Sequence, residues 1–517
     1  MTPTQRIALN TFATYARSMI AMLLGLLSSR WIFGSLGEVD YGLMAVVSAL
    51  IAIVYFINMG ISSASARYFA FSIGEGDTNQ TNRWFNAALC LHVLLVPVLM
   101  LLVWGLGEWA LRDFLNIPEA RLTTALWVFR IALLAAFCGL ALSPYIDMFI
   151  AKQNILEVSL WALLTSFVNF GLAWVVLSYA GDRWLFISIG MASFAVIAVC
   201  VQAVRASILY PECRIRFSLW TDVSRVWELC QFSGWGLLGA MGELCRGQGL
   251  AVLLNYRFTP THHPQVNASY AVGLSLSSYT QSLSHALMQA FAPEITATEG
   301  RGERSKMLQH ANRVSKYGTF LTLLFAIPLI LEIDYVLELW LVEPPQFAAA
   351  MTTLILSAFI IERCGSGQTA AITANGKIAA YHLTVGGCMI LTLPLAYCLL
   401  QYGMGAIAVC WAYVATVIFC LLGKLYWARR LVAASLRAWL REVLMPCCVV
   451  LAGGLIVGWS VLCSFSDASF IRLVAVVLTS LLASTTLAWC SLLSASERAQ
   501  VKAICRDRSS LAAPTAL

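Results

Sequence analysis

The chain has 517 residues, of which 60% are hydrophobic and 11% are charged, and its formal net charge is +7. Soluble domains carry about 25% charged residues, so this composition excludes a soluble globular protein and indicates an integral membrane protein. Apolar runs of about 20 residues recur along the whole length, and each is long enough to cross about 30 Å of hydrocarbon as a helix. The expected fold class is therefore an all-α, polytopic membrane protein.

The hydropathy pattern predicts about fourteen transmembrane helices joined by short loops. In chain order they lie approximately at residues 12–35, 41–63, 85–107, 122–146, 157–180, 184–206, 233–256, 267–292, 315–338, 347–372, 378–402, 404–427, 443–465 and 470–493. We expect an N-terminal six-helix lobe at 1–206, a cytoplasmic amphipathic linker helix at 207–232 and a C-terminal six-helix lobe at 233–430. Two additional transmembrane helices and a cytoplasmic tail follow at 431–517.

The linker contains the sequence FSLWTDVSRVWELC at residues 217–230. On a helix, its apolar residues fall on one face and its charged residues, Asp222, Arg225 and Glu228, fall on the other. This pattern is typical of a helix that lies on the membrane surface.

Lys and Arg residues are distributed unequally between the two sets of alternating loops. About 23 lie in the loops on one side of the predicted bundle and about 5 in those on the other. The positive-inside rule makes the richer side cytoplasmic, so both termini are expected in the cytoplasm. The basic charge is then a topological signal and an attraction to anionic membrane lipids, and no nucleic-acid partner is expected.

No spacing of cysteines or histidines predicts a metal centre. Most of the 16 cysteines fall inside apolar runs, where a thiol behaves as a small hydrophobe, and no CxxC pair occurs. His262 and His263 lie in a short loop that offers no further ligands. A GxxxxGK[ST] phosphate loop is absent, which excludes ATP hydrolysis by this chain. We therefore expect no metal, no cofactor and no catalytic residues.

The two halves of the chain resemble each other at an offset of about 230 residues. NRWFNAALCLHVLLVP runs from Asn82 to Pro97, and NRVSKYGTFLTLLFAIP runs from Asn312 to Pro328. An even number of predicted helices separates the two copies, so both copies have the same orientation in the membrane. Parallel repeats of this kind predict two pseudo-symmetric bundles that rock about a central cavity.

Arginines inside the predicted helices follow the same offset. Arg17 and Arg246 are 229 positions apart, and Arg130 and Arg363 are 233 positions apart. A charge at the bilayer centre costs at least about 2.5–3.5 kcal/mol, so such residues are expected to face a wet interior or a partner.

Polar residues of these helices also fall on single helical faces. Glu243 shares a face with Arg246 and with neighbouring glycines, and Asn58 shares a face with two serines. The helix predicted at 267–292 carries four polar residues on one line: Ser278, Ser282, His285 and Gln289. Faces of this kind are suited to line a wet interior.

Each of these groups has a structural alternative. Glu243 and Arg246 are three positions apart and can neutralise each other within one helix. Lines of serine and glycine also occur where helices pack closely. His285 is either a packing residue or a proton-sensitive group. Arg17 has no acidic residue within one turn, which favours a role in a cavity.

Three segments carry a resemblance to a known family: RWIFGSLGEVDYGLMAVV at 30–47, GISSASARYFA at 60–70 and ASYAVGLSLSSYTQSLSHALMQAFAPEI at 268–295. They resemble the polysaccharide-transport branch of the multidrug/oligosaccharidyl-lipid/polysaccharide flippase superfamily, which includes the O-antigen flippases. The resemblance covers essentially the first twelve predicted helices. It implies two six-helix lobes in alternating access that move undecaprenyl-pyrophosphate-linked glycans outward across the inner membrane of a bacterium, for lipopolysaccharide or other surface polysaccharide.

Under this resemblance, Arg17 and Arg246 are the expected pyrophosphate contacts, with Arg130 and Arg363 as second candidates and Glu243 tuning Arg246. A cationic cavity suits a pyrophosphate because that group must be drawn into a low-dielectric site. The polar side chains suited to glycan hydroxyls are Asn58, Ser278, Ser282, His285 and Gln289. The expected partners are membrane lipids, the lipid-linked oligosaccharide and a coupling ion, H⁺ or Na⁺, and the chain is expected to act as a monomer.

Two other functions fit parts of the sequence. A multidrug/cation antiporter of the same superfamily is expected to present acidic groups to its cargo, but Glu243 is the main acid inside the predicted helices and the arginines outnumber it. A membrane glycan ligase or polymerase needs a sizeable outer loop with catalytic groups, whereas the predicted outer loops have about a dozen residues. We therefore expect a transporter rather than an enzyme.

Overall fold

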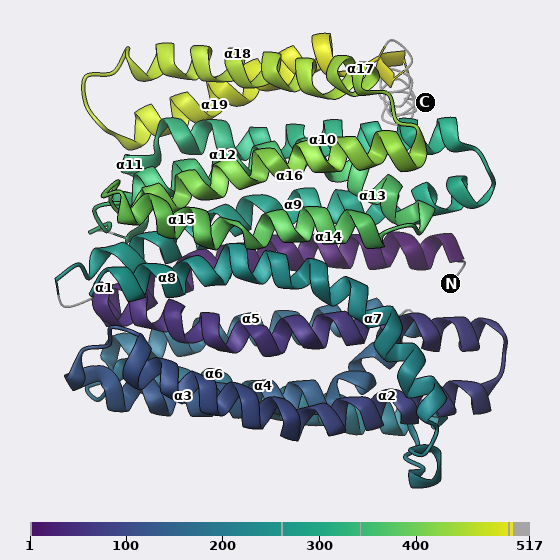
Figure 1. Ribbon diagram of the computed structural model, residues 1–517. Coiled ribbons are helices and arrows are strands. Elements are labelled where there is room, and N and C mark those ends of the chain that lie inside the picture. Colours follow the sequence, from purple (N-terminus) through teal and green to yellow (C-terminus); the bar gives the residue numbers. More distant parts are fainter. Residues whose placement is uncertain (1–2, 153, 260–261, 342, 495–496, 500–517) are drawn as a thin grey trace, which may run out of the picture. The chain divides into compact units, whose positions relative to one another are not determined.

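Every regular element is a helix in the part of the chain that the structure, a computed structural model, describes. That part comprises residues 3–152, 154–259, 262–341, 343–494 and 497–499 (Figure 1). Each predicted transmembrane segment coincides with helical residues for nearly its whole length. The predicted all-α, polytopic fold class is confirmed.

The first two predicted helices are one long helix, α1 (Pro3–Gly74), which bends at Gly37. Gly37 has a φ of 72°, in the left-handed region that residues with a Cβ rarely adopt, so the chain changes direction there without a loop. The stretch Met19–Ile73 has 55 residues, which at about 1.5 Å per residue is long enough to cross a membrane twice.

The next helices follow the predicted order closely. They are α2 (Thr78–Leu99), the π-helical turn η1 (Met100–Trp104), α3 (Gly105–Trp109), η2 (Ala110–Phe114), α4 (Glu119–Ala151), α5 (Ile155–Val175), η3 (Val176–Ser178) and α6 (Arg183–Leu209). α4 packs against both α1 and α6, and their shared core includes the buried side chains of Leu43, Phe129 and Trp184. Because lipid tails are as apolar as this core, close packing rather than exclusion of water holds such helices together.

The stretch 207–232 is not a single helix, in contrast to the linker helix expected there. α6 ends at Leu209, two short 3-10 turns follow as η4 (Pro211–Cys213) and η5 (Phe217–Leu219), and α7 (Val223–Leu244) then begins. Pro211 lacks an N–H and disfavours helix at the residue before it. Asp222 starts the new helix as its N-cap, where its carboxylate accepts a hydrogen bond from the Arg225 N–H. The apolar face recognised in the sequence therefore belongs partly to the first turns of α7.

α7 continues through the π-helical turn η6 (Cys245–Gly249) into α8 (Leu250–Arg257). The helices that follow are α9 (Gln265–Gly300), α10 (Arg304–Leu331), α11 (Ile333–Leu341), α12 (Ala348–Cys364), α13 (Ser366–Asn375), α14 (Ala379–Ile390), α15 (Thr392–Gln401) and α16 (Ala408–Val432). The chain ends with α17 (Leu436–Trp439), η7 (Leu440–Leu444), α18 (Met445–Leu462), α19 (Phe470–Leu487) and η8 (Ala488–Leu492).

Ten helical stretches among the described residues are long and apolar enough to cross a membrane, and the bent pair α12 and α13 makes eleven. The stretches α7 to α8 and α9 are outside this set, although both coincide with predicted spans. They carry Glu243, Arg246 and the serine-rich run of α9, and polar residues of this kind lower the hydropathy of a helix.

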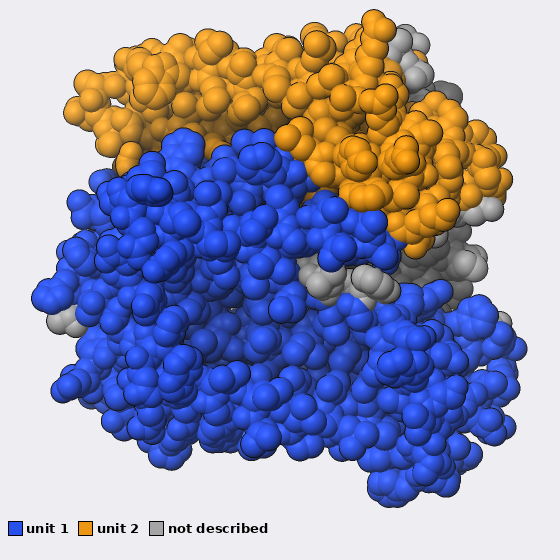
Figure 2. Space-filling view, viewed as in Figure 1, with its two compact units in different colours: residues 1–279, 337–355, 378–420 blue, residues 280–336, 356–377, 421–517 orange. Residues whose placement is uncertain are grey.

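The chain divides into two compact units, which Figure 2 shows in different colours. Unit 1 comprises residues 1–279, 337–355 and 378–420, and unit 2 comprises residues 280–336, 356–377 and 421–517. The borders between the units fall inside α9, α11, α12 and α16 and between α13 and α14, so these four helices each contribute to both units.

The repeat seen in the sequence reappears as a shared contact. Asn82 in α2 and Asn312 in α10 begin the two matched segments, and each binds a residue 130 positions further along the chain. The Asn82 amide donates to the Glu212 carbonyl at 2.7 Å, and the Asn312 amide donates to the Glu442 carboxylate at 2.9 Å. The first contact lies within unit 1 and accepts at a backbone carbonyl, and the second lies within unit 2 and accepts at a side-chain carboxylate.

Candidate functional site

Arg246 lies on a helical turn that is shaped by glycines. The sequence CRGQG at 245–249 forms the π-helical turn η6 between α7 and α8. A π turn interrupts the regular hydrogen-bond ladder of a helix, and such turns are frequent at functional sites. Here the Gly247 carbonyl accepts a hydrogen bond from the Tyr270 hydroxyl at 2.8 Å. The turn is thereby fixed to α9.

The guanidinium of Arg246 is enclosed by protein. The residue is only 1% exposed, and its Nη2 lies 3.1 Å from the carboxylate of Glu243. Its Cζ lies 5.0 Å from the centre of the Tyr413 ring, within the range of a cation–π contact. A buried charge is stable only with a compensating charge and hydrogen bonds. The pairing of Glu243 with Arg246 that the sequence suggests is therefore present.

The two ends of this ion pair differ in exposure. The Glu243 side chain is 47% exposed, whereas the Arg246 side chain is 2% exposed. Gly242 precedes the pair and packs against α14, where a Cβ would lie 2.8 Å from the Gly386 carbonyl oxygen. A side chain at position 242 would therefore push the two helices apart. Within the pair, the carboxylate is the accessible end and the guanidinium the enclosed one.

Arg17 and Asn58 are half-buried and lie on α1, on opposite sides of its bend. The Nε of Arg17 and the Oδ1 of Asn58 are buried without a hydrogen-bond partner in the described part of the chain. Nearly all buried polar atoms in proteins have a partner, so these two atoms retain capacity to bind another group. Neither residue is bonded to Arg246 among the residues that the structure describes.

Arg130 belongs to a separate ion pair. Its Nε donates to the Glu108 carboxylate at 2.6 Å, and Glu108 also accepts from the Trp104 indole at 2.9 Å. The Arg130 guanidinium lies 5.4 Å from the centre of the Trp127 ring. Arg130 thus connects α4 to α3, and the described residues include no bond between it and Arg17 or Arg246.

Arg363 lies near the end of α12 in unit 2 and is 7% exposed. Its Nη2 donates to the Gln281 side-chain oxygen at 2.9 Å, and its Nη1 lies 3.9 Å from the sulfur of Met288. Both partners are on α9, and Gln281 is adjacent in sequence to the predicted polar line of that helix. The structure therefore places Arg363 beside α9.

The predicted polar line of α9 is described in part. Ser278 is exposed, and its hydroxyl donates to the Ser275 carbonyl of the same helix at 2.7 Å. Serine hydroxyls commonly form such local bonds in helices. The side chains of Ser282, His285 and Gln289 lie outside the described residues.

Asp147 on α4 is a buried acid that the sequence analysis missed. It is 2% exposed, its Oδ1 is hydrogen-bonded to the Ser62 hydroxyl, and the Ser62 hydroxyl also lies 2.8 Å from that of Ser143. The sequence predicts a helix over 122–146, whereas α4 extends to Ala151. Asp147 therefore falls just beyond the predicted span, although the structure buries it.

Glu332 is a second enclosed acid that the sequence did not indicate, and it follows α10 directly. It is 2% exposed and accepts two hydrogen bonds from the Arg472 guanidinium of α19, at 2.9 and 2.7 Å. Two parallel bonds of this kind are the strongest arrangement that arginine forms with a carboxylate. In the sequence, Glu332 lies inside the helix predicted at 315–338, and Arg472 lies near the start of the helix predicted at 470–493.

Glu497 follows η8, outside the membrane-spanning helices, and holds two cations of α10. Its carboxylate lies 3.0 Å from Arg313 and 3.1 Å from Lys316. Burial raises the pKa of Glu497, but hydrogen bonds from the Ser494 backbone and hydroxyl, from Tyr317 and from Lys316 outweigh it and lower the pKa to about 2. Glu497 is therefore ionised at neutral pH and connects the end of the chain to α10.

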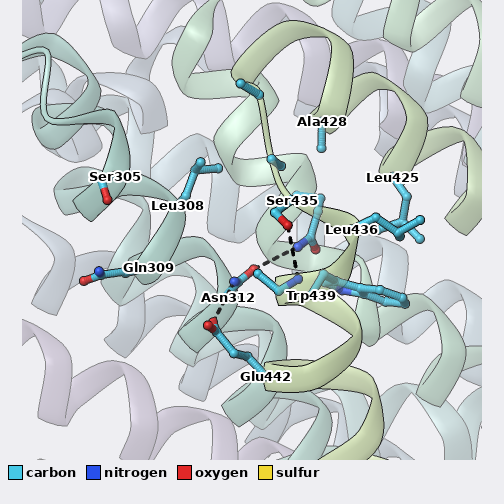
Figure 3. Close-up of a pocket in the computed structure, with 14 residues that line it drawn as sticks. Ser305, Leu308, Gln309, Asn312, Leu425, Ala428, Ser435, Leu436, Trp439 and Glu442 are labelled. Carbon is cyan, nitrogen blue, oxygen red and sulfur yellow. Dashed lines mark hydrogen bonds between the residues drawn. The ribbon is translucent and has the colours of Figure 1, made fainter.

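A cavity of about 200 Å³ lies in unit 2 beside the Asn312 contact (Figure 3). The Asn312 amide is bonded on both sides, because it accepts from Gln368 at 3.2 Å and donates to Glu442 at 2.9 Å. The Trp439 indole lines the same cavity and donates to the Cys364 carbonyl at 2.9 Å. These bonds fix the turn between α16 and α17. No group of three His, Cys, Asp or Glu side chains that could hold a metal occurs among the described residues.

Solved structures match this chain in fold, whereas no known family pattern and no curated relative matches its sequence. The lipid II flippase MurJ, in an inward closed conformation, superposes with a TM-score of 0.71 at 12% identity, over 93% of this chain and 98% of its own. An inward-facing multidrug resistance MATE family transporter of the MOP superfamily gives a TM-score of 0.63 at 13% identity, over 82% of this chain and 98% of its own. The MATE transporter VcmN of Vibrio cholerae, in a bent form, gives 0.57 at 16% identity, over 84% and 99%.

Identities this low demonstrate a shared fold. The chain shares the fold of the lipid II flippase MurJ and of the MATE transporters, and this is the fold that its sequence resemblance implies. It is a multi-pass membrane protein, and its structural neighbours are transporters. The flippase matches 93% of this chain, whereas the two MATE transporters match 82% and 84% of it.

Proposed function

We propose that this protein is a flippase that moves a lipid-pyrophosphate-linked oligosaccharide outward across the cytoplasmic membrane of a bacterium, for surface polysaccharide assembly. The lipid carrier is undecaprenyl. The repeated halves at 1–206 and 233–430 act as the two lobes of an alternating-access transporter, and both termini face the cytoplasm. α18 and α19 stand outside the repeat.

The observation that carries this proposal is the enclosed guanidinium of Arg246, in a chain that shares its fold with a flippase of lipid II. Arginine is always charged, and its planar fork matches phosphate oxygens with two parallel bonds. In a low-dielectric site these charge-assisted bonds are stronger than in water. An arginine at this place therefore suits an anionic headgroup better than a cationic drug.

The Glu243–Arg246 pair suggests how the cargo enters. In the absence of cargo, Glu243 compensates the charge of the enclosed Arg246 at 3.1 Å. An arriving phosphate takes the place of the carboxylate, and the half-exposed Glu243 turns towards water. This exchange keeps the guanidinium paired throughout, which avoids the penalty of several kcal/mol for an isolated buried charge.

The other candidates have graded roles in this proposal. Arg17 gives a second contact to the pyrophosphate, since its buried Nε has no partner among the described residues. Asn58 and the polar line of α9 meet glycan hydroxyls. Arg363 holds that line through Gln281. Arg130, bound to Glu108, positions α4 rather than cargo.

The proposal is tested by Arg246→Ala, Arg246→Lys and Arg17→Ala in cells that make the polysaccharide. Loss of a charge-assisted contact removes roughly 1.5–3 kcal/mol of binding, which corresponds to about a tenfold to hundredfold weakening. Both alanine variants should lose surface glycan and accumulate the lipid-linked intermediate on the cytoplasmic face. Arg246→Lys should keep part of the function, because the charge remains while the fork is lost.

The matched control is Arg112→Ala, which removes a half-exposed arginine that lies 3.6 Å from Glu108. It should export normally at the same protein level. Normal export by both Arg246→Ala and Arg17→Ala, with wild-type amounts of inserted protein, would refute the cationic cavity.

The proposed topology has its own measurement. Reporter fusions after Leu517 and in the 256–266 loop should report opposite sides of the membrane. Two reports from the same side would overturn the orientation and with it the outward direction of transport.

A further inference from the structure

We propose that Asp147 is a proton-binding site, that it is neutral in the conformation described above, and that its proton is the ion coupled to transport. The last part rests on the proposed function, whereas the proton site itself does not. Nothing in the Arg246 region requires this residue, and it stands on a different helix.

Asp147 is enclosed by protein, and no charged partner for it occurs among the described residues. Asp147 is 2% exposed, its Oδ1 is bonded to the Ser62 hydroxyl, and its Oδ2 is buried with no partner among the described residues. An ionised carboxylate offers about four acceptor positions, and one hydroxyl satisfies one of them. Burial of an unpaired carboxylate costs several kcal/mol, and uptake of a proton removes that charge.

The charged side chains near this end of α4 contact residues other than Asp147. Lys152, at the end of α4, is bonded to Glu212 at 2.6 Å, and Arg205 of α6 is bonded to Glu157 of α5. Arg67 of α1 lies over the Phe232 ring at 4.4 Å. The elements packed against α4 also carry Tyr55 and Tyr68 on α1, Arg83, Cys90 and His92 on α2, and Cys200 on α6, and Tyr145 lies on α4 itself.

His92 resembles Asp147 in one respect, because its Nε2 is also buried without a partner in the described chain. Its Nδ1 lies 2.8 Å from the Ala88 carbonyl of its own helix, so that nitrogen carries a proton and donates. No bond joins His92 to Asp147 among the described residues, and the histidine therefore does not neutralise the acid. A proton on the carboxyl group is the compensation that remains.

Two hydroxyl groups, those of Ser62 and Ser143, form a row beside Asp147. The Ser62 hydroxyl lies between Asp147 and the Ser143 hydroxyl, from which it is separated by 2.8 Å. With a charged carboxylate, Ser62 donates to Asp147 and accepts from Ser143. With a neutral carboxyl group, Asp147 donates to Ser62 and Ser62 donates to Ser143. The same three groups thus satisfy either state by reversing the direction of their bonds.

The position of the site links its proton to conformation. Ser62 is on α1, while Ser143 and Asp147 lie before and after Pro144 in α4, a continuous helix in which proline lacks the N–H for one backbone hydrogen bond. Loss of the proton leaves an anion, which favours a conformation in which α1 and α4 admit water between them. Proton binding favours the closed arrangement. A ligand that binds one conformation better shifts the equilibrium towards it, and this is the requirement for coupling.

The proton is tested directly by infrared spectroscopy on the full chain in lipid nanodiscs. At neutral pH the wild type should show the C=O stretching band of a buried carboxylic acid, and Asp147→Asn should lack it. Ser62→Ala should shift the band, because it removes the hydroxyl to which the carboxyl group is bonded in the described part of the chain. Asparagine has the shape of the acid, so the variant is expected to fold.

Glu332→Gln is the matched control, because Glu332 is equally enclosed but paired with Arg472. It should leave the band in place. Identical spectra for the wild type and Asp147→Asn would show that Asp147 is ionised and overturn the proposal. A band that disappears when Na⁺ replaces choline at constant ionic strength would assign the site to a metal cation and also overturn it.

Transport supplies the second readout. In vesicles loaded with a lipid-pyrophosphate glycan, the wild-type rate should depend on the pH gradient and the Asp147→Asn rate should not. A wild type that shows the band but moves no such lipid leaves the proton site standing and refutes the proposed cargo. Transport that responds to the gradient equally in both proteins refutes the coupling role of Asp147 and leaves the cargo standing.

Discussion

Asp147 and Glu332 are equally enclosed, yet their surroundings differ in kind. Each is 2% exposed. Glu332 accepts two bonds from the Arg472 guanidinium, at 2.9 and 2.7 Å, whereas Asp147 is bonded only to the Ser62 hydroxyl within the described part of the chain. The charge of Glu332 is neutralised permanently by a residue of the fold. In the proposal above, the charge of Asp147 is neutralised by a proton, which binds and dissociates. The partner, and not the degree of burial, separates a structural anchor from a site.

Among the variants at these two sites, Arg472→Ala is expected to change the stability of the protein most. This variant leaves the Glu332 carboxylate enclosed and unpaired, and removal of one member of a buried pair costs about 3–5 kcal/mol. We expect a large fall in the free energy of unfolding, measured by denaturation in mixed micelles. The double variant Arg472→Met with Glu332→Leu should recover most of the loss, because it leaves no charge behind. A single variant as stable as the wild type would mean that the pair does not anchor α19.

Ser62→Ala should have an intermediate effect. It leaves a neutral carboxyl group without the one hydrogen-bond partner that the described residues provide, and an unsatisfied buried polar group costs about 1–3 kcal/mol. The same denaturation measurement gives the value, with Ser278→Ala as the control, because that hydroxyl is exposed and bonds only to its own helix. A loss as large as that of Arg472→Ala would show that Ser62 holds a charge rather than a neutral acid.

Asp147→Asn should change stability least among these three, by about 1 kcal/mol or less, because an amide replaces a neutral acid of the same shape. The thermal unfolding midpoints of the variant and the wild type should coincide at acid pH and separate at alkaline pH, where only the wild type acquires a buried charge. Midpoints that differ equally at every pH would contradict a titrating Asp147.

Glu497 is expected to show the opposite sign of pH dependence. Its pKa in the structure is about 2, below the value of about 4.3 for a free glutamate. Its bonds therefore stabilise the protein fully above the unfolded-state value, and this stability is lost as the pH falls towards 2. Glu497→Gln should weaken this acid dependence without changing the alkaline side. If Glu497→Gln leaves the loss of stability at acid pH unchanged, other carboxylates cause that loss.

The sequence predicts those features of the structure that depend on residues close together along the chain. Hydropathy located the helices, and the spacing of Glu243 and Arg246 predicted their ion pair because both stand on one helix. The partners of Arg130 and Arg363 could not be predicted, since Glu108 and Gln281 come from other helices. Asp147 was missed for a related reason. A hydropathy window ends a span where charge appears, so an acid near a helix end is assigned to the surface unless its tertiary partner, here Ser62, is known.

The repeated asparagine contact has a consequence for how the protein is made. Asn82 reaches Glu212, and Asn312 reaches Glu442, each across 130 residues. A ribosome adds about 5–20 residues per second, so such a stretch emerges on the order of ten seconds after its asparagine. Both residues of the first connection are synthesised before Asn312, so this connection is able to close first. The N-terminal half is thus able to complete its own bonds while the second half is still entering the membrane, and the second half later repeats the same step with its own asparagine.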